Sequence, residues 1–159
     1  MNLEEYCGTL TEEQKLVLSV RLIKTAMPAW ERFAGKNKLT YRDSVVLLKH
    51  EVDKNLLQNV IEEIESVLQE QNPLKKLRTG KYLLKLYEDF CEPVTAVQDD
   101  DWKMTHAAEK IFYSVYNLLS AVIEGNGPAY YVAINQAIDA IETDNIIPEE
   151  EIRFILKDF

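Results

Sequence analysis

Apolar side chains recur every three or four residues along most of this chain, which is the spacing of one face of an α-helix. The stripes run from Leu16 to Phe33, from Val45 to Leu68, from Tyr82 to Phe90, from Ala108 to Ile123 and from Tyr130 to Ile141. Only five Gly and five Pro interrupt 159 residues, which is few for a protein of many tight turns. We therefore expect an all-α fold without strands, in which a single bundle of about six helices forms one domain over residues 1–159.

Capping residues and helix breakers place the expected helix ends. Thr11–Gln14 forms a capping box before the first long helix, in which Pro28 is expected to cause a kink or a restart. A second capping box at Thr40–Asp43 predicts a helix that runs to Leu68, with a break near Lys54–Asn55 because about 30 residues is long for a globular helix. Further boundaries are expected at Gly35, Asn72–Pro73, Thr79–Gly80, Pro93, Gly125, Pro128 and Pro148.

The charge of the chain is strongly negative and unevenly distributed. The net charge is −9, and residues 1–85 carry 14 basic and 12 acidic side chains, whereas residues 86–159 carry 4 basic and 15 acidic ones. Nucleic acids and anionic membranes are bound through clusters of Lys and Arg, so we expect neither as a partner. The basic strip Lys75–Lys85 is interpreted as a solvated helix face, and the acidic half favours a basic protein partner.

Cysteine usage and the first residues indicate a cytoplasmic protein. Cys7 and Cys91 form no CxxC pair, and Cys91, beside Phe90, is expected to pack in the core. Residues 1–10 lack the positive region and the apolar run of a signal peptide. No apolar run is long enough to span a bilayer.

Motifs for nucleophilic or phosphate-binding chemistry do not occur in the chain. There is no GxSxG, GxxxxGKS/T or GxGxxG sequence, so we expect no catalytic residue and no cofactor. His106 and Glu109 share a helix face, but in the reverse of the Glu-x-x-His order that di-iron bundles use, and no metal site is expected. One enzyme alternative stays open, a metal-dependent hydrolase that gathers the carboxylates of Glu62, Glu65 and Asp99–Asp101.

Three successive aspartates, Asp99, Asp100 and Asp101, precede Trp102 and a strongly apolar helix. Asp is a preferred N-cap residue, and acids in the first turn complement the helix dipole, so helix capping is the main interpretation. A patch that faces a partner is a compatible alternative, whereas a metal site would need further ligands nearby. Trp102 is expected to be partly buried, and it joins the candidate contact residues because Trp is enriched at interfaces.

The stretch Met27–Phe33 (MPAWERF), after an apolar first helix and before Tyr41–Arg42 at the start of a second, resembles the YjaG-like family of small helical bacterial proteins. The same pattern, over about residues 10–60, also resembles helical immunity proteins of bacterial toxin systems. No catalytic residue carries over from either resemblance. The second resemblance implies only a role, which is to bind and block a toxin domain.

These features predict a non-enzymatic interaction domain, with an immunity protein that blocks a basic toxin as its specific form. An acidic inhibitor gains association rate through electrostatic steering toward a basic partner. The candidate partner-binding residues are Asp99, Asp100, Asp101, Trp102, Asp139, Glu142, Asp144, Glu149, Glu150 and Glu151. A further alternative is a homodimer that packs through the small-residue ridge of Ala133, Ala137 and Ala140.

Overall fold

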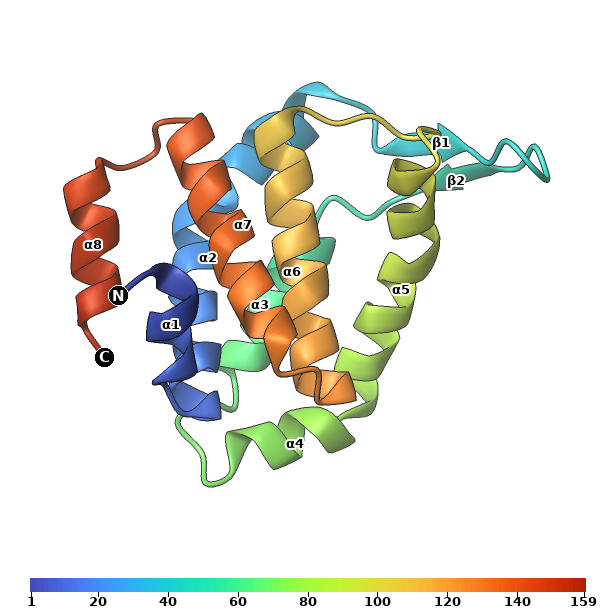
Figure 1. Cartoon of the computed structure of the whole chain (residues 1–159). Helices are drawn as coiled ribbons and strands as arrows, with labels where there is room; N and C mark the ends of the chain where they lie inside the picture. Colours follow the sequence, from blue (N-terminus) through green and yellow to red (C-terminus); the bar gives the residue numbers. More distant parts are fainter.

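Eight helices and one short β-hairpin make up the computed structural model, which describes residues 1–159 (Figure 1). The helices are α1 (Leu3–Gly8), α2 (Glu12–Lys36), α3 (Leu56–Glu65), α4 (Pro73–Thr79), α5 (Lys81–Gln98), α6 (His106–Glu124), α7 (Pro128–Thr143) and α8 (Glu149–Lys157). The strands are β1 (Thr40–Arg42) and β2 (Lys49–Glu51). The prediction of a mainly helical fold is confirmed, whereas the predictions of about six helices and of no strand are wrong. No helix is both long enough and apolar enough to cross a membrane.

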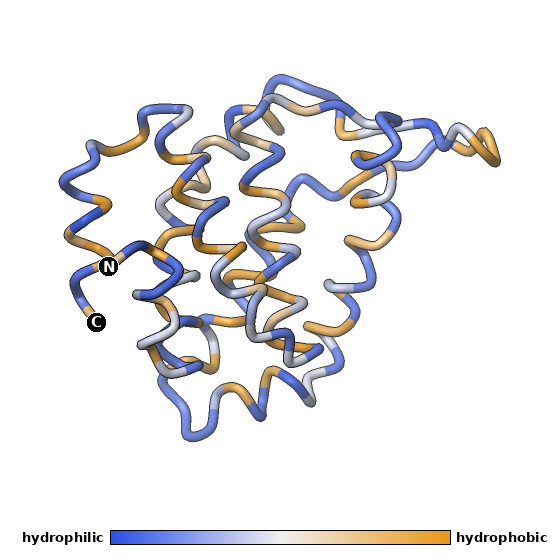
Figure 2. The backbone as a smooth tube through the Cα atoms, viewed as in Figure 1, coloured by the Kyte–Doolittle hydropathy of each residue, from blue (hydrophilic) through white to orange (hydrophobic).

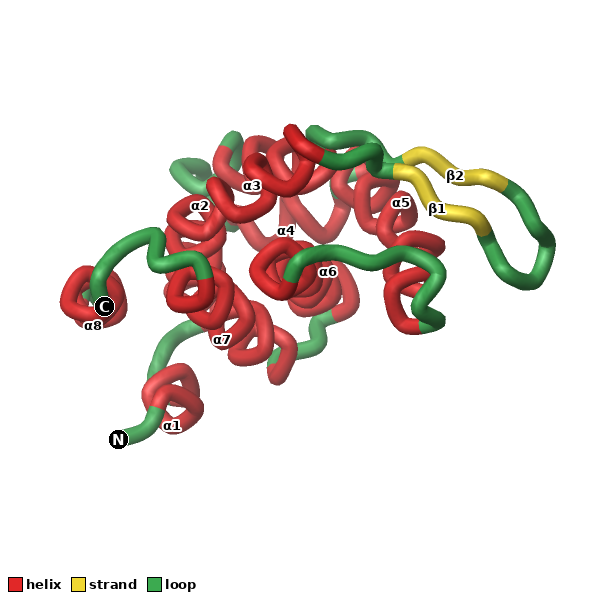
Figure 3. Tube along the Cα trace, turned by 90° about the horizontal axis from the view of Figure 1, so that it is seen from above, coloured by secondary structure: helices red, strands yellow, loops and turns green.

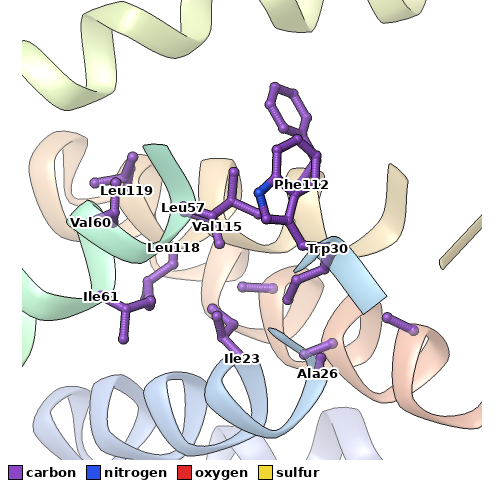
Figure 4. Close-up of a cluster of buried hydrophobic side chains, with 14 of the residues drawn as sticks. Ile23, Ala26, Trp30, Leu57, Val60, Ile61, Phe112, Val115, Leu118 and Leu119 are labelled. Atoms are coloured by element: carbon purple, nitrogen blue, oxygen red, sulfur yellow. The ribbon is translucent and has the colours of Figure 1, made fainter. Parts of the chain in front are cut away.

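The centre of the fold is formed by α2, α6 and α7, which pack against one another. Each buries a wide apolar stripe, as expected for helices that face a globular core. Figure 4 shows part of this core, where side chains from α2, α3 and α6 meet. The labelled residues are Ile23, Ala26 and Trp30 of α2, Leu57, Val60 and Ile61 of α3, and Phe112, Val115, Leu118 and Leu119 of α6.

The small-residue ridge of α7 lies inside the molecule. Ala133, Ala137 and Ala140 are fully buried where α7 packs against α6 and α2. Methyl side chains let the helix axes approach closely. Across the same interface, Ser114 Oγ donates a hydrogen bond of 2.6 Å to the carbonyl oxygen of Ala133. The ridge is therefore not available as the surface of a homodimer.

Several predicted helix ends agree with the structure. The capping box at Thr11 and Gln14 begins α2, and Gly125 ends α6 with a left-handed backbone (φ 67°) that favours glycine. Pro128 opens α7 at the first helical position, and Pro148 caps α8. These boundaries depend on short-range chemistry, which is why the sequence predicts them.

Two prolines do not break their helices. Pro28 lies inside a continuous α2, which also passes Gly35 and ends after Lys36, so the predicted restart and the predicted cap are wrong. Pro93 lies inside α5, which continues to Gln98 instead of closing at the proline. A proline in a helix loses one hydrogen bond. Buried neighbours such as Trp30 and Val94 offset that loss through packing.

The largest error concerns residues 40–51, which form an antiparallel hairpin instead of the start of a helix. Strands β1 and β2 pair Thr40 with Glu51, Tyr41 with His50, and Arg42 with Lys49. The Asp43 side chain accepts hydrogen bonds from the backbone N–H groups of Val45 and Val46. This arrangement is an Asx-turn, which competes with helix formation. Of the predicted second helix, only α3 forms, beginning just after the expected break at Lys54–Asn55.

The close packing of α7 can be tested by placing a larger side chain at one of its buried positions. Ala137→Leu adds three carbon atoms at a fully buried site, and it is expected to lower the free energy of unfolding by about 1–3 kcal/mol. Asn135→Leu, at an exposed position of the same helix, is the control and is expected to change it by less than about 0.5 kcal/mol. Urea denaturation measures both variants, and an unchanged midpoint for Ala137→Leu would contradict this packing.

Candidate functional site

Two adjoining hollows lie between the hairpin and the outer face of α5. The larger has a volume of about 490 Å³, the smaller has a volume of about 250 Å³, and both are lined by Tyr41 and Glu92. We call them together the acidic cleft, because eight carboxylates line them and only Lys85 and His50 bring basic groups. The carboxylates are those of Asp43, Glu51, Asp53, Glu88, Asp89, Glu92, Asp99 and Asp101.

Helix α5 supplies one wall of the acidic cleft through its periodicity. Glu88 and Asp89 lie three and four residues after Lys85, and Glu92 lies four and three residues after them, which places all four on one face of the helix. The opposite face of α5, which includes Phe90, is buried against the core. The amphipathic pattern of α5 therefore turns this charged row outward, toward the hairpin.

Few cations neutralise the carboxylates of the acidic cleft. Lys85 Nζ lies 3.8 Å from Asp89 Oδ2, and His50 Nδ1 lies 3.5 Å from Glu92 Oε2. Glu51, Glu88 and Asp99 make no ion pair. The cleft therefore carries excess negative charge, and a hollow lined by one sign of charge concentrates the opposite sign.

A series of aromatic rings fixes the hairpin to the core. Tyr41 stacks on His50 with ring centroids 5.0 Å apart, and it also stacks on Trp102 at 5.8 Å. Trp102 meets Phe112 of α6 edge-on at 5.6 Å, and Phe112 stacks on Trp30 of α2 at 5.9 Å. Burial raises the pKa of Tyr41 to about 12, with the charges of Glu92 and Asp43 adding to the shift, so its phenol stays protonated at neutral pH. Tyr41 therefore forms an uncharged wall of the acidic cleft that is joined to the core by stacked rings.

The three aspartates do not cap α6. Asp99 follows the last residue of α5, Asp100 has a left-handed backbone (φ 58°), and Thr105 caps α6 by accepting a hydrogen bond from the N–H of Ala108. Capping is therefore the wrong interpretation, because α5 runs on through Pro93 and its end occupies the position expected for the start of the next helix.

Asp101 instead holds the hairpin against the end of α5. Its Oδ2 accepts hydrogen bonds from Ser44 N at 3.1 Å and from Ser44 Oγ at 3.0 Å. Asp99 and Asp101 line the smaller hollow, so two of the three aspartates belong to the acidic cleft.

Trp102 and Cys91 take positions that differ from the predicted ones. Trp102 is only 5% exposed, so it is a core residue and not a surface that a partner contacts. Cys91 is exposed and lines the smaller hollow, so the prediction that it packs in the core is wrong, whereas Cys7 is buried.

The other predicted acidic residues lie on α7, on α8 and between them. Asp139 lies 3.3 Å from His106 Nε2 and near Lys110, and Asp144 Oδ2 lies 3.2 Å from Arg32 Nη1. Glu142 is exposed near the end of α7, and Glu149, Glu150 and Glu151 form the first turn of α8. Figures 1 and 3 place α8 on the far side of the bundle from α5 and the hairpin. The structure therefore divides the predicted acidic residues between two separate regions.

The carboxylates of the hydrolase alternative do not meet. Glu62 and Glu65 lie on α3, where Glu62 accepts a hydrogen bond from Gln58 at 3.0 Å and Glu65 pairs with Lys24 at 2.9 Å. No three side chains of His, Cys, Asp or Glu lie close enough together to hold a metal ion. The bundle gives this alternative no ligand set.

Sequence reasoning missed the residues that α5 contributes to the acidic cleft. Glu88 and Glu92 repeat at a spacing of four residues, and this was a signal for an acidic helix face. Their meeting with Glu51 and Asp53 was not visible, because it depends on the hairpin, which the sequence pattern did not predict.

Comparison with known proteins found no relative of this chain. No protein-family model matches the chain, and no curated protein or solved structure matches it.

The aromatic series predicts that the hairpin depends on Trp102. Trp102→Ala removes the ring between Tyr41 and Phe112 and is expected to lower the free energy of unfolding by about 3–5 kcal/mol. Tyr82→Ala removes an exposed ring from the wall of the same cleft and is expected to cost less than about 1 kcal/mol. Guanidinium denaturation compares the two variants, and equal losses would show that Trp102 does not anchor the hairpin.

The turn of the hairpin is expected to depend on pH through Asp43. Hydrogen bonds from the N–H groups of Val46 and Val45 lower the pKa of its carboxyl below 3.8. The stabilisation is therefore fully present above pH 3.8 and is lost as the pH falls through the lower folded value. In a titration followed by NMR, the amide resonances of Val45 and Val46 are expected to move together with a midpoint below 3.8.

Asp43→Asn is the control for this titration, because it keeps an oxygen acceptor and has no carboxyl to titrate. In this variant the acid-dependent movement of the two amides is expected to disappear. A wild-type midpoint at or above 3.8 would show that these hydrogen bonds do not form.

Proposed function

We propose that this chain is a non-enzymatic protein-interaction domain that binds a basic partner protein through the acidic cleft. One observation carries the proposal. The cleft gathers eight carboxylates from the hairpin, from α5 and from the segments beside them, against two basic groups, one of which is a histidine. Such a site selects cationic side chains over anionic or apolar ones.

The shape of the acidic cleft favours side chains that project from the partner. A hollow of about 490 Å³ has room for Lys or Arg side chains, and its carboxylates come from two sides, which allows a guanidinium group to bind more than one of them. Because six of the eight carboxylates are exposed, each ion pair with them adds little affinity in salt, and the main effect is on the rate and the specificity of association.

The specific form of the proposal is an immunity protein that blocks a toxin. A toxin that acts on nucleic acid needs a basic surface, and an acidic cleft competes for that surface by presenting the charge of the substrate. The resemblance to helical immunity proteins supports this form only through Met27–Phe33 in α2, because Tyr41–Arg42 lie in a strand and do not open the second helix of that pattern. A cytoplasmic location belongs to the same proposal, and the absence of a disulfide between Cys7 and Cys91 is consistent with it.

Charge reversal distinguishes the acidic cleft from the acidic residues of α8. Glu51→Lys with Glu88→Lys changes two cleft carboxylates that make no ion pair, so the fold is expected to tolerate it. The control, Glu150→Lys with Glu151→Lys, makes the same change in net charge on α8. Each variant is immobilised and exposed to lysate of the source cell at about 50 mM and about 300 mM salt, which span the range over which surface charges become screened.

The expected result is a basic protein retained at low salt by the wild type and by the α8 variant. Retention by the cleft variant is expected to fall by about tenfold or more. If both variants retain the protein equally, the acidic cleft is not the binding surface. If only the α8 variant loses it, the contact surface lies on α8.

A further inference from the structure

The end of the hairpin is an exposed apolar projection. We define the hairpin tip as Val45–Leu48, four consecutive aliphatic residues whose exposed fractions are 84%, 57%, 64% and 60%. Figures 1 and 3 show this segment extending beyond the helices, and Figure 2 shows its hydrophobic colour at the outermost point of the chain. Single exposed apolar residues are ordinary, whereas a contiguous group on a projecting loop marks an interaction surface.

Most backbone N–H groups of the hairpin tip already have hydrogen-bond partners within the protein. Asp43 Oδ1 accepts hydrogen bonds from the N–H groups of Val45 at 2.7 Å and Val46 at 3.1 Å. The N–H of Leu47 donates to the Asp43 carbonyl at 2.9 Å, and the N–H of Asp43 donates to the Leu48 carbonyl at 2.9 Å. An N–H group buried without a partner is costly. Because the N–H groups of Val45, Val46 and Leu47 already have partners, three of the four N–H groups of the hairpin tip can enter an apolar pocket without that cost.

Leu47 adopts a left-handed backbone conformation, with φ of 59°. A bulky residue in this region is strained, and such strain persists only where the surrounding structure imposes it. The hydrogen bonds of Asp43 impose it here, and the result is a turn that exposes four aliphatic side chains. The conformation is therefore fixed before any partner arrives, which reduces the entropy lost on binding.

Charge decides which occupant fits the hairpin tip. Arg42 and Lys49 face each other across the strands just behind it, while the acidic cleft lies at the base of the hairpin. An anionic lipid surface would attract the two cations and would be repelled by the eight carboxylates of the cleft and by a net charge of −9. The charges thus oppose a membrane as the occupant.

A second copy of the chain also fits poorly. A largely apolar hollow of about 270 Å³ between α1 and α8 is bordered by Arg153 and Lys157. These cations would meet Arg42 and Lys49 of an inserted hairpin. Four side chains also fall far short of the ~800 Å² per partner that a stable interface buries.

We propose that the hairpin tip inserts into an apolar pocket of the same basic protein that occupies the acidic cleft. This inference rests on the proposed function and adds the second contact of that interface. The hairpin joins the two contacts, since Tyr41, His50 and Glu51 line the cleft and Val45–Leu48 extend beyond it. The partner therefore presents an apolar pocket with carboxylates at its rim, facing Arg42 and Lys49, beside a basic patch that faces the cleft.

Photo-crosslinking tests where the partner sits. A benzophenone amino acid is placed at Val46 in the hairpin tip, at Glu88 in the acidic cleft, and at Glu13 on α2 as the control, and the full chain is irradiated in the source cell. Adducts of Val46 and Glu88 with one and the same basic protein, absent from the Glu13 control, are the expected result. The identified protein is then purified for titration.

Titration separates the two contacts. Val46→Ser with Leu47→Asn removes two aliphatic side chains, and Asn tolerates the left-handed conformation that Leu47 adopts, so the thermal midpoint is expected to stay unchanged. The dissociation constant is expected to rise about 10- to 100-fold with the same salt dependence, because the lost contact is apolar. The cleft variant, Glu51→Lys with Glu88→Lys, is expected to weaken the salt dependence itself.

Each other outcome overturns the inference in a distinguishable way. An adduct at Glu88 alone, or an unchanged dissociation constant for the hairpin-tip variant, overturns the inference and leaves the proposed function in place. A Val46 adduct with lipid or with a second copy of the chain identifies a different occupant. The absence of an adduct at both positions overturns the inference and the proposed function together.

Discussion

The close contact of α7 with α2 and α6, made at buried alanines, is the constraint on which the rest of the structure depends. Because Ala133, Ala137 and Ala140 extend no further than a methyl group, three helices pack tightly enough to form one core. That packing fixes α6, and α6 carries Phe112, the ring on which Trp102 rests. The position of the hairpin, and therefore the width of the acidic cleft, is set from inside the bundle.

Features specified by neighbouring residues could be predicted from the sequence, and features specified by distant contacts could not. Thr11 with Gln14, Gly125 and Pro128 act within one helical turn, so their roles follow from their identities. The hairpin depends on Tyr41 meeting Trp102, which lies 61 positions further along the chain. Periodicity gave the wrong result there because Val45 and Leu48 have helical spacing but no core to face. Pro28 and Pro93 were misjudged for a related reason, since tertiary packing outweighs the hydrogen bond that each removes.

The residues of the candidate site likewise divide into those that the sequence identifies and those that only the folded chain brings together. Asp99 and Asp101 were identified from the sequence as candidate contacts, and both line the acidic cleft, although Asp101 also ties down Ser44. Trp102 was a candidate contact because Trp is enriched at interfaces, but Trp is also highly buried on average, and only its burial in the structure decides between the two roles. The contributions of Glu51 and Glu88 depend on a strand and a helix that meet only in the folded chain.

The shortness of the strands has a consequence for the solubility of the free chain. A segment such as Val45–Leu48, rich in aliphatic and β-branched residues, is the kind that recruits other chains into extended sheets when it continues a long, flat edge. Here each strand contributes three residues, and Arg42 and Lys49 place two like charges side by side where any added strand would have to pair. We therefore expect the aliphatic segment at the end of this hairpin not to nucleate aggregation, because the backbone behind it offers too little edge for a growing sheet.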